Sequence, residues 1–210
     1  MKKILLSVVI VGLIVSSCSA VDVLMTPAAV GRDNMSIQGF YSSTPVRLAD
    51  GNITIWGPKV VYGINNDLDL IGKVGSVSTN VSGSNTGATL IGVGGKYSIP
   101  KSTWNTPVDV AAVLGYDSIS GKDVNWSMLS FGLIGSKSLR SNFDIYASLY
   151  GVQNSNKFTG GKSENSNDFQ WGFGAKYQFS KKLSALAELM LYTMSSDSYQ
   201  TFSMAVQYEM

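Results

Sequence analysis

One segment of the sequence alternates between apolar residues and polar or small residues with a period of two. From Phe169 to Phe179, every second residue is apolar, and the residues between them are Gln, Gly or Lys. A helical period does not explain this order, whereas an extended strand places all the apolar side chains on one face. The segment also has about the length of a membrane-crossing strand, ~9–11 residues.

The same period continues from about Asn34 to the end of the chain. In the last segment, Phe202, Met204, Val206, Tyr208 and Met210 share one face. Ten candidate strands follow from such segments, at 34–43, 53–64, 67–76, 87–99, 107–117, 125–137, 142–153, 168–179, 183–194 and 199–209. We therefore predict an all-β fold, an antiparallel up-and-down transmembrane β-barrel of about ten strands, with eight or twelve as alternatives.

Membrane entry by helices is not expected beyond the N-terminal region. No apolar stretch of helix-spanning length follows Ala20, so a mature chain that enters a membrane must do so as a closed barrel of strands. Charged residues make up only 14% of the sequence, below the roughly 25% of soluble domains. With three arginines and a net charge of +2, the chain also lacks the clustered positive field of a nucleic-acid binder.

Several kinds of chemistry are excluded by residues that the chain lacks. It has no histidine, which removes Ser-His triads, Cys-His pairs and His-ligated metals. Its single cysteine excludes an intrachain disulfide framework. We therefore expect no catalytic residues, no metal site, no cofactor and no enzymatic activity.

The N-terminus has the organisation of an export signal. Lys2 and Lys3 precede an apolar run from Ile4 to Val15, and small residues follow up to Ala20. We predict a signal peptide over 1–20, a lead-in over 21–33 and a barrel over 34–210. Cleavage after Ala20 is one alternative; in the other, residues 15–18 act as a lipobox and Cys18 becomes a lipidated first residue.

The connections between the predicted strands alternate in character. Short turns are predicted near 65–67, 137–141 and 180–182, and mostly longer polar loops at 43–52, 77–86, 118–124 and 154–167. Short turns at one rim and long loops at the other are typical of up-and-down outer-membrane barrels. Tyr62, Tyr97 and Tyr177 each precede a turn of the first kind, where an aromatic girdle would lie.

With this pattern over residues 34–210, the chain resembles the small bacterial outer-membrane β-barrel proteins of the OmpA-like and OmpX-like group. The resemblance implies a bacterial outer-membrane location, contact with outer-membrane lipid and assembly by the barrel-insertion machinery. Members usually end in an aromatic residue, whereas this chain ends in Met210.

Charged residues are expected on the inward stripe, because a basic residue at mid-depth on the lipid face costs ~2–4 kcal/mol. Eight fall there: Lys59, Asp69, Lys73, Lys96, Asp109, Asp144, Lys176 and Glu188. Across hairpins, the expected pairs are Lys59 with Asp69, Lys96 with Asp109, and Lys176 with Glu188. We interpret the set as an ion-pair network that fills a narrow lumen, with glycines such as Gly72, Gly92 and Gly172 leaving room for long side chains. The other interpretation is a charged constriction or a catalytic pair.

These patterns predict a non-enzymatic outer-membrane barrel with a structural or surface-interaction role through its long loops, chiefly 154–167 and 77–86. Two alternatives remain open from the sequence. One is a narrow passive pore for small solutes. The other is a lipid-anchored, soluble β-barrel or sandwich tethered through Cys18, in which the apolar stripe would face an interior.

Overall fold

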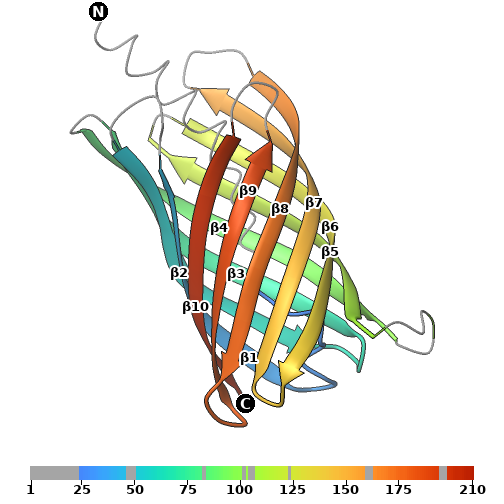
Figure 1. Cartoon of the computed structure of the whole chain (residues 1–210). Coiled ribbons are helices and arrows are strands. Elements are labelled where there is room, and N and C mark those ends of the chain that lie inside the picture. The colour runs from blue at the N-terminus through green and yellow to red at the C-terminus, as the bar shows by residue number, and fades with distance from the viewer. Residues whose placement is uncertain are drawn as a thin grey trace, which may run out of the picture.

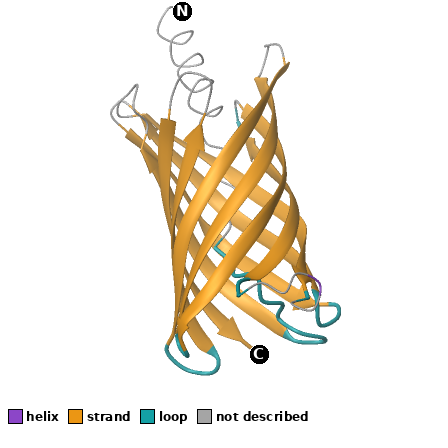
Figure 2. Ribbon diagram, turned by 45° about the vertical axis from the view of Figure 1, so that its right-hand side comes forward, coloured by secondary structure: helices purple, strands orange, loops and turns teal. Residues whose placement is uncertain are grey.

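The computed structural model describes residues 24–45, 51–81, 84–100, 103, 107–122, 124–158, 163–193 and 198–210. They form one closed barrel of ten antiparallel strands, shown from two sides in Figure 1 and Figure 2. In chain order the strands are β1 (Met35–Pro45), β2 (Gly51–Gly63), β3 (Leu68–Val81), β4 (Ser84–Ile99), β5 (Asp109–Gly121), β6 (Val124–Arg140), β7 (Phe143–Phe158), β8 (Ser163–Gln178), β9 (Leu183–Thr193) and β10 (Ser198–Glu209). The predicted fold class and strand number are confirmed.

Each strand pairs with its neighbours in the chain, and β1 pairs with β10 to close the barrel. In the closing ladder, Ser36 lies opposite Glu209 and Ser43 lies opposite Phe202. Closure leaves no open sheet edge, so the backbone of the wall is paired all round the barrel, as a membrane span requires. We call the rim that carries the C-terminus the lower rim and the other the upper rim, as they appear in Figure 1.

The prediction of long loops at one rim is wrong. The connections at the upper rim are 46–50, 82–83, 122–123, 159–162 and 194–197; those at the lower rim are 64–67, 100–108, 141–142 and 179–182. Most of 77–86 belongs to β3 and β4, and most of 154–167 belongs to β7 and β8. These residues form strands whose outward face has become polar, which in the sequence looks the same as a loop.

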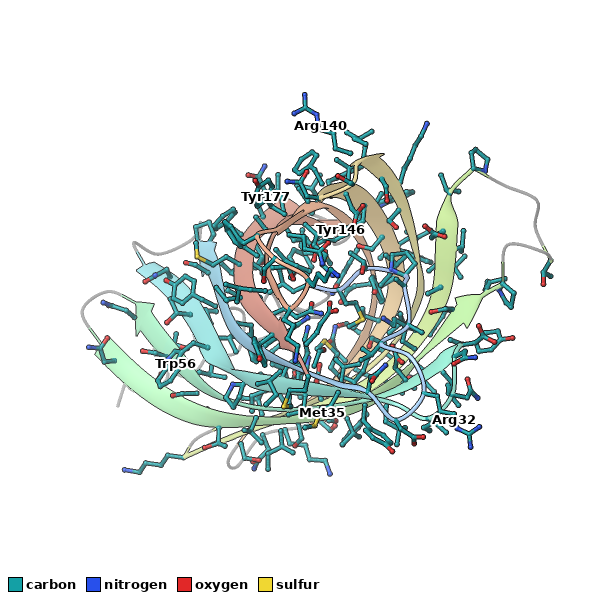
Figure 3. All side chains as sticks on the ribbon, turned by 90° about the horizontal axis from the view of Figure 1, so that it is seen from below. Arg32, Met35, Trp56, Arg140, Tyr146 and Tyr177 are labelled. Atoms are coloured by element: carbon teal, nitrogen blue, oxygen red, sulfur yellow. The ribbon has the colours of Figure 1, made fainter. Side chains whose placement is uncertain are left out.

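The apolar stripe of the strands faces outward, as predicted. Phe169, Trp171 and Phe173 are 63%, 48% and 55% exposed, and the apolar residues of β10 share this orientation. Tyr62, Tyr97 and Tyr177 also face outward near the lower rim, where the girdle was expected. Figure 3 shows Trp56 and Tyr177 on the outside of the ring and Tyr146 within it. Among the described residues, no helix is both long and apolar enough to cross a membrane.

The inward face changes in character along the barrel. Its upper part holds apolar and aromatic side chains such as Trp126 and Tyr150 together with buried polar ones such as Asn154, Asp168 and Gln170. Its lower part carries the buried charges Lys59, Asp69, Lys96 and Glu188. The apolar and aromatic share of the upper lumen was not expected, because the alternation assigned apolar residues mainly to the lipid side.

Candidate functional site: the lower lumen

The lower lumen is occupied by the chain's own N-terminal segment. Residues 24–30, which we call the lumen segment, run inside the barrel and then turn at 31–34 into β1. Leu24 is fully buried and Met25 is 7% exposed, and both belong to the hydrophobic core of the barrel. The sequence predicted only a lead-in here, so this occupant of the lumen is a finding of the structure.

Two buried charges hold the inner end of the lumen segment. The backbone N–H of Leu24 donates a 2.8 Å hydrogen bond to Glu188 Oε2 on β9. The backbone carbonyl of the same residue accepts one of 3.3 Å from Lys59 Nζ on β2. Glu188 is also the acceptor for the Tyr146 hydroxyl at 3.2 Å, which fixes the carboxylate in place. A charged donor and a charged acceptor therefore bind the two backbone polar groups of one residue, Leu24.

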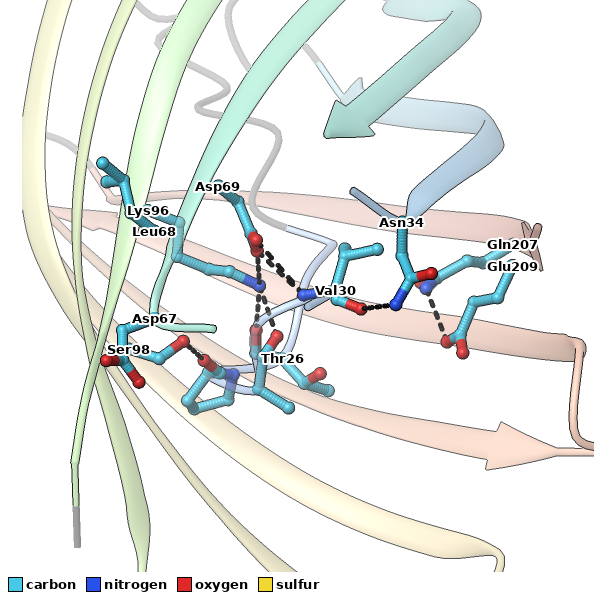
Figure 4. A network of polar contacts seen from close by, with 12 residues as sticks. Thr26, Val30, Asn34, Asp67, Leu68, Asp69, Lys96, Ser98, Gln207 and Glu209 are labelled. Atoms are coloured by element: carbon cyan, nitrogen blue, oxygen red, sulfur yellow. Dashed lines mark hydrogen bonds and ion pairs between the residues drawn. The ribbon is translucent and has the colours of Figure 1, made fainter. Parts of the chain in front are cut away.

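The outer end of the lumen segment is held by β3 and β4 (Figure 4). The Val30 N–H donates to both oxygens of Asp69, at 3.2 Å each. Lys96 Nζ donates to the carbonyls of Thr26 and Ala28, at 3.0 and 2.6 Å. It also forms an ion pair of 3.1 Å with Asp69. In addition, the Ser98 hydroxyl donates to the carbonyl of Pro27.

A tight turn directs the lumen segment into β1 at the lower rim. Gly31 has a φ of +93° and Asp33 one of +59°, both in the left-handed region that favours glycine and tolerates aspartate. Asp33 N–H donates to the Gly63 carbonyl at 2.9 Å, and Gly63 N–H donates to the Asn34 carbonyl at 3.0 Å. Any Cβ at Gly63 would collide with the Gly31 carbonyl, so the two glycines allow the close approach.

The structure brings five of the eight predicted charges into the buried network, but its ion pairs differ from those predicted. Lys59, Asp69 and Glu188 are at most 2% exposed, Lys96 is 4% exposed, and the side chain of Lys73 is 8% exposed. Asp69 pairs with its direct cross-strand partner Lys96, and Glu188 binds the lumen segment. Lys59 lies opposite Lys73, not opposite Asp69.

The other three predicted charges lie toward the lower rim and are half-buried. Asp109 is opposite Ser136, and Asp144 is opposite Lys176 in the ladder. Lys176 forms its ion pair of 3.3 Å with Glu209, not with Glu188 as predicted. Register explains the difference, because residues at equal distances from an assumed turn need not be opposite each other once the true strand ends are known.

Two charged residues of the network were missed by the sequence analysis. Asp117 on β5 forms a 3.0 Å ion pair with Lys73, and Glu209 on β10 pairs with Lys176. Both follow the alternation of their strands, with Asp117 in phase with the inward-facing Val113 and Ile119. The alternation of the strands therefore carried the signal for both residues.

A polar cavity of about 210 Å³ remains between the lumen segment and the wall at the lower mouth. Along one side, Gln38 Nε2 donates to Gln207 Oε1 at 2.7 Å, and Gln207 Nε2 donates to Glu209 Oε1 at 3.0 Å. Because an ionised carboxylate only accepts hydrogen bonds, Glu209 orients Gln207, which in turn orients Gln38. Within the described part of the chain, no cluster of three His, Cys, Asp or Glu side chains suits a metal ion.

No protein-family model matches the sequence, and no curated protein matches it. Three solved structures with similar folds are the N-terminal β-barrel domain of Pseudomonas aeruginosa OprF, the Ail protein of Yersinia pestis in a bilayer nanodisc, and the translocator domain of the autotransporter NalP from Neisseria meningitidis. OprF is 14% identical, with 86% of this chain and 99% of that chain covered and a TM-score of 0.37. Ail is 13% identical, with 85% of this chain and 100% of that chain covered and a TM-score of 0.45. NalP is 10% identical, with 85% of this chain and 88% of that chain covered and a TM-score of 0.46.

In its structure, the chain is a small closed β-barrel with an apolar outer surface. Ligands or solutes of such a barrel would be accommodated in its lumen. Here the lower lumen already holds residues 24–30 of the chain itself. The predicted signal peptide over 1–20 and its Cys18 lie outside the described residues.

Proposed function

We propose that the protein is an exported, non-catalytic outer-membrane barrel that is closed to solutes and acts through the polar surface of its upper rim. The observation that supports this proposal most directly is the lumen segment. It lies across the lower lumen and is held there by Glu188, Lys59, Asp69 and Lys96. An open passive pore would need this space for water and solute.

The upper lumen supports the same conclusion independently. Trp126, Met128 and Tyr150 are at most 4% exposed, and Trp126 Nε1 donates to Asn154 Oδ1 at 3.2 Å. Side chains packed to this degree fill a narrow barrel, which resembles a folded core more than a conduit. Two layers of different chemistry thus close the lumen, a layer of mixed apolar and polar side chains above and a peptide-filled layer with several charges below.

The polar upper ends of the strands provide the surface for interaction. On β3, the outward residues change from Leu70 and Val74 to Ser76, Ser78 and Asn80. The outward face of β8 changes in the same way, from Phe169 to Asn167 and Asn165. Uncharged hydroxyl and amide groups of this kind offer both hydrogen-bond donors and acceptors to a partner in the envelope or beyond it. This surface takes the role that the sequence gave to loops 77–86 and 154–167.

The outward apolar stripe argues against the soluble, lipid-anchored alternative. A soluble sandwich would turn Phe173 and Val206 inward, whereas they are 55% and 56% exposed on the outside of the barrel. A continuous apolar surface of this kind marks contact with a membrane or a partner. Export by the predicted signal peptide, outer-membrane location and insertion by the barrel-assembly machinery complete the proposal; processing at Cys18 remains an independent prediction.

Conductance in planar lipid bilayers tests the proposal. The purified full-length protein is expected to insert without stable single-channel steps, because two layers of side chains and the lumen segment close the path. A known open porin at the same protein-to-lipid ratio controls for insertion. Stable ion-sized steps from the protein alone would contradict the closed-lumen proposal and favour the passive pore.

A further inference from the structure

The wall of the lower lumen contacts the lumen segment through the segment's main chain. Glu188 and Asp69 accept hydrogen bonds from the N–H groups of Leu24 and Val30. Lys59, Lys96 and Ser98 donate to the carbonyls of Leu24, Thr26, Pro27 and Ala28. Main-chain groups are common to all residues, so these contacts fix the course of the backbone, which bends at Pro27 and Ala28, and leave most side-chain identities open.

From this arrangement we infer that the lower lumen is a peptide-binding site that recognises the main chain of its ligand. Its ligand class is an uncharged peptide that bends as residues 24–30 do, and its normal occupant is that segment of the protein itself. Four of its wall residues, Lys59, Asp69, Lys96 and Glu188, are at least nine-tenths buried. The inference rests on the proposed function, because it concerns the same segment that closes the lumen.

Side chains of the lumen segment refine the class of peptide. Leu24 and Met25 pack into the barrel core and Pro27 is buried, whereas the side chain of Ala28 is exposed. The site therefore takes an apolar pair at the inner end, followed by small residues. A charge at the inner end would be buried in the hydrophobic core that holds Leu24 and Met25 and would be strongly disfavoured.

Competition from the tethered segment determines how the site is tested. A tethered peptide has an effective concentration on the order of mM, so a free peptide binds only after the tethered one has left. The variant Leu24→Asp displaces the lumen segment, because it places a carboxylate in the hydrophobic core that buries the Leu24 side chain, and leaves the wall unchanged. Ala28→Asp is the matched control, since it adds the same charge at an exposed position of the segment.

The experiment measures the binding of a fluorescent synthetic peptide with the sequence of residues 21–34 to full-length protein in lipid nanodiscs. Fluorescence anisotropy is expected to show saturable binding to Leu24→Asp. Binding to the unmodified protein and to Ala28→Asp is expected to be weaker by about 100-fold. A peptide N-methylated at the residues that correspond to Leu24 and Val30 lacks both donors, and is expected to lose about tenfold in affinity for each methyl group.

Two outcomes would overturn the inference. One is equal binding of the N-methylated peptide, which would mean that the main chain is not recognised. The other is no binding by Leu24→Asp and none by the double variant Leu24→Asp/Met25→Asp, which removes both apolar anchors. Neither outcome bears on the conductance of the unmodified protein, so the closed-lumen proposal stands or falls separately.

Discussion

Lys73 and Asp117 form a 3.0 Å ion pair across a strand that lies between them. Lys73 is on β3 and Asp117 on β5, and the strand between them is β4. Gly92 of β4 is the direct register partner of both residues, so the ion pair passes over its Cα. A Cβ at this position would overlap Asp117 Oδ1 and the Lys73 side chain. Glycine at 92 is therefore a condition for the pair.

The substitution Gly92→Ala is expected to lower the free energy of unfolding by about 1–3 kcal/mol, the usual cost of overpacking. Urea unfolding in phospholipid vesicles measures it. Gly72→Ala is the matched control, because a Cβ at Gly72 meets nothing within 4 Å; its effect is expected to stay within about 0.5 kcal/mol. Equal losses for the two variants would show that the space above Gly92 does not matter.

The ion pair of Asp69 and Lys96 is expected to be the most costly one to break. Both side chains are at most 5% exposed, so Asp69→Asn leaves a buried ammonium group without its carboxylate. We expect the free energy of unfolding to fall by about 3–5 kcal/mol.

A double-mutant cycle separates the interaction energy of this pair from the other contacts of the two side chains. The losses in the free energy of unfolding caused by Asp69→Asn and by Lys96→Met are expected to differ from additivity in the double variant by about 1–3 kcal/mol. The same cycle on Lys176 and Glu209, whose side chains are 14% and 39% exposed, is expected to give about 0–1 kcal/mol. A coupling for the buried pair no larger than for the half-exposed one would contradict this ranking.

Sequence alternation was sufficient to predict the barrel itself. The period of two in residues 169–179 and 202–210 fixed both the strand type and the side that faces outward, and the exposed side chains agree. Alternation was not sufficient at the upper strand ends. Beyond the apolar band, both faces of a strand can be polar, and residues such as 154–158 then look like a loop.

Two features could not be predicted from the sequence, each for its own reason: the pairing within the charge network and the occupant of the lumen. Register decides the pairing, and it depends on strand ends that alternation leaves uncertain by a few residues. The lumen segment is held through its carbonyl and N–H groups, which its side chains do not reveal. Only the apolar Leu24 and Met25 carried a sequence signal, and a lead-in before a strand does not require burial.

The apolar band is expected to be sensitive to charge and the upper strand ends are not. Phe173 is 55% exposed and lies in the middle of the outward stripe of β8. Phe173→Lys is therefore expected to lower the free energy of unfolding in lipid vesicles by about 2–4 kcal/mol. Asn167→Lys lies on the same face of the same strand beyond the stripe, and is expected to cost about 0–1 kcal/mol. Similar costs at both positions would place the membrane boundary elsewhere.

Tryptophan quenching by lipid decides which face of the barrel wall meets the membrane. Trp56 and Trp171 are 57% and 48% exposed on the outer wall, whereas Trp126 is 3% exposed inside the lumen. Single-tryptophan variants, with the other tryptophans replaced by Phe, are reconstituted in phospholipids brominated on their acyl chains. We expect strong quenching of Trp56 and Trp171 and little quenching of Trp126. Quenching of Trp126 as strong as that of Trp171, or no quenching of Trp171, would contradict a lipid-facing outer stripe around a closed interior.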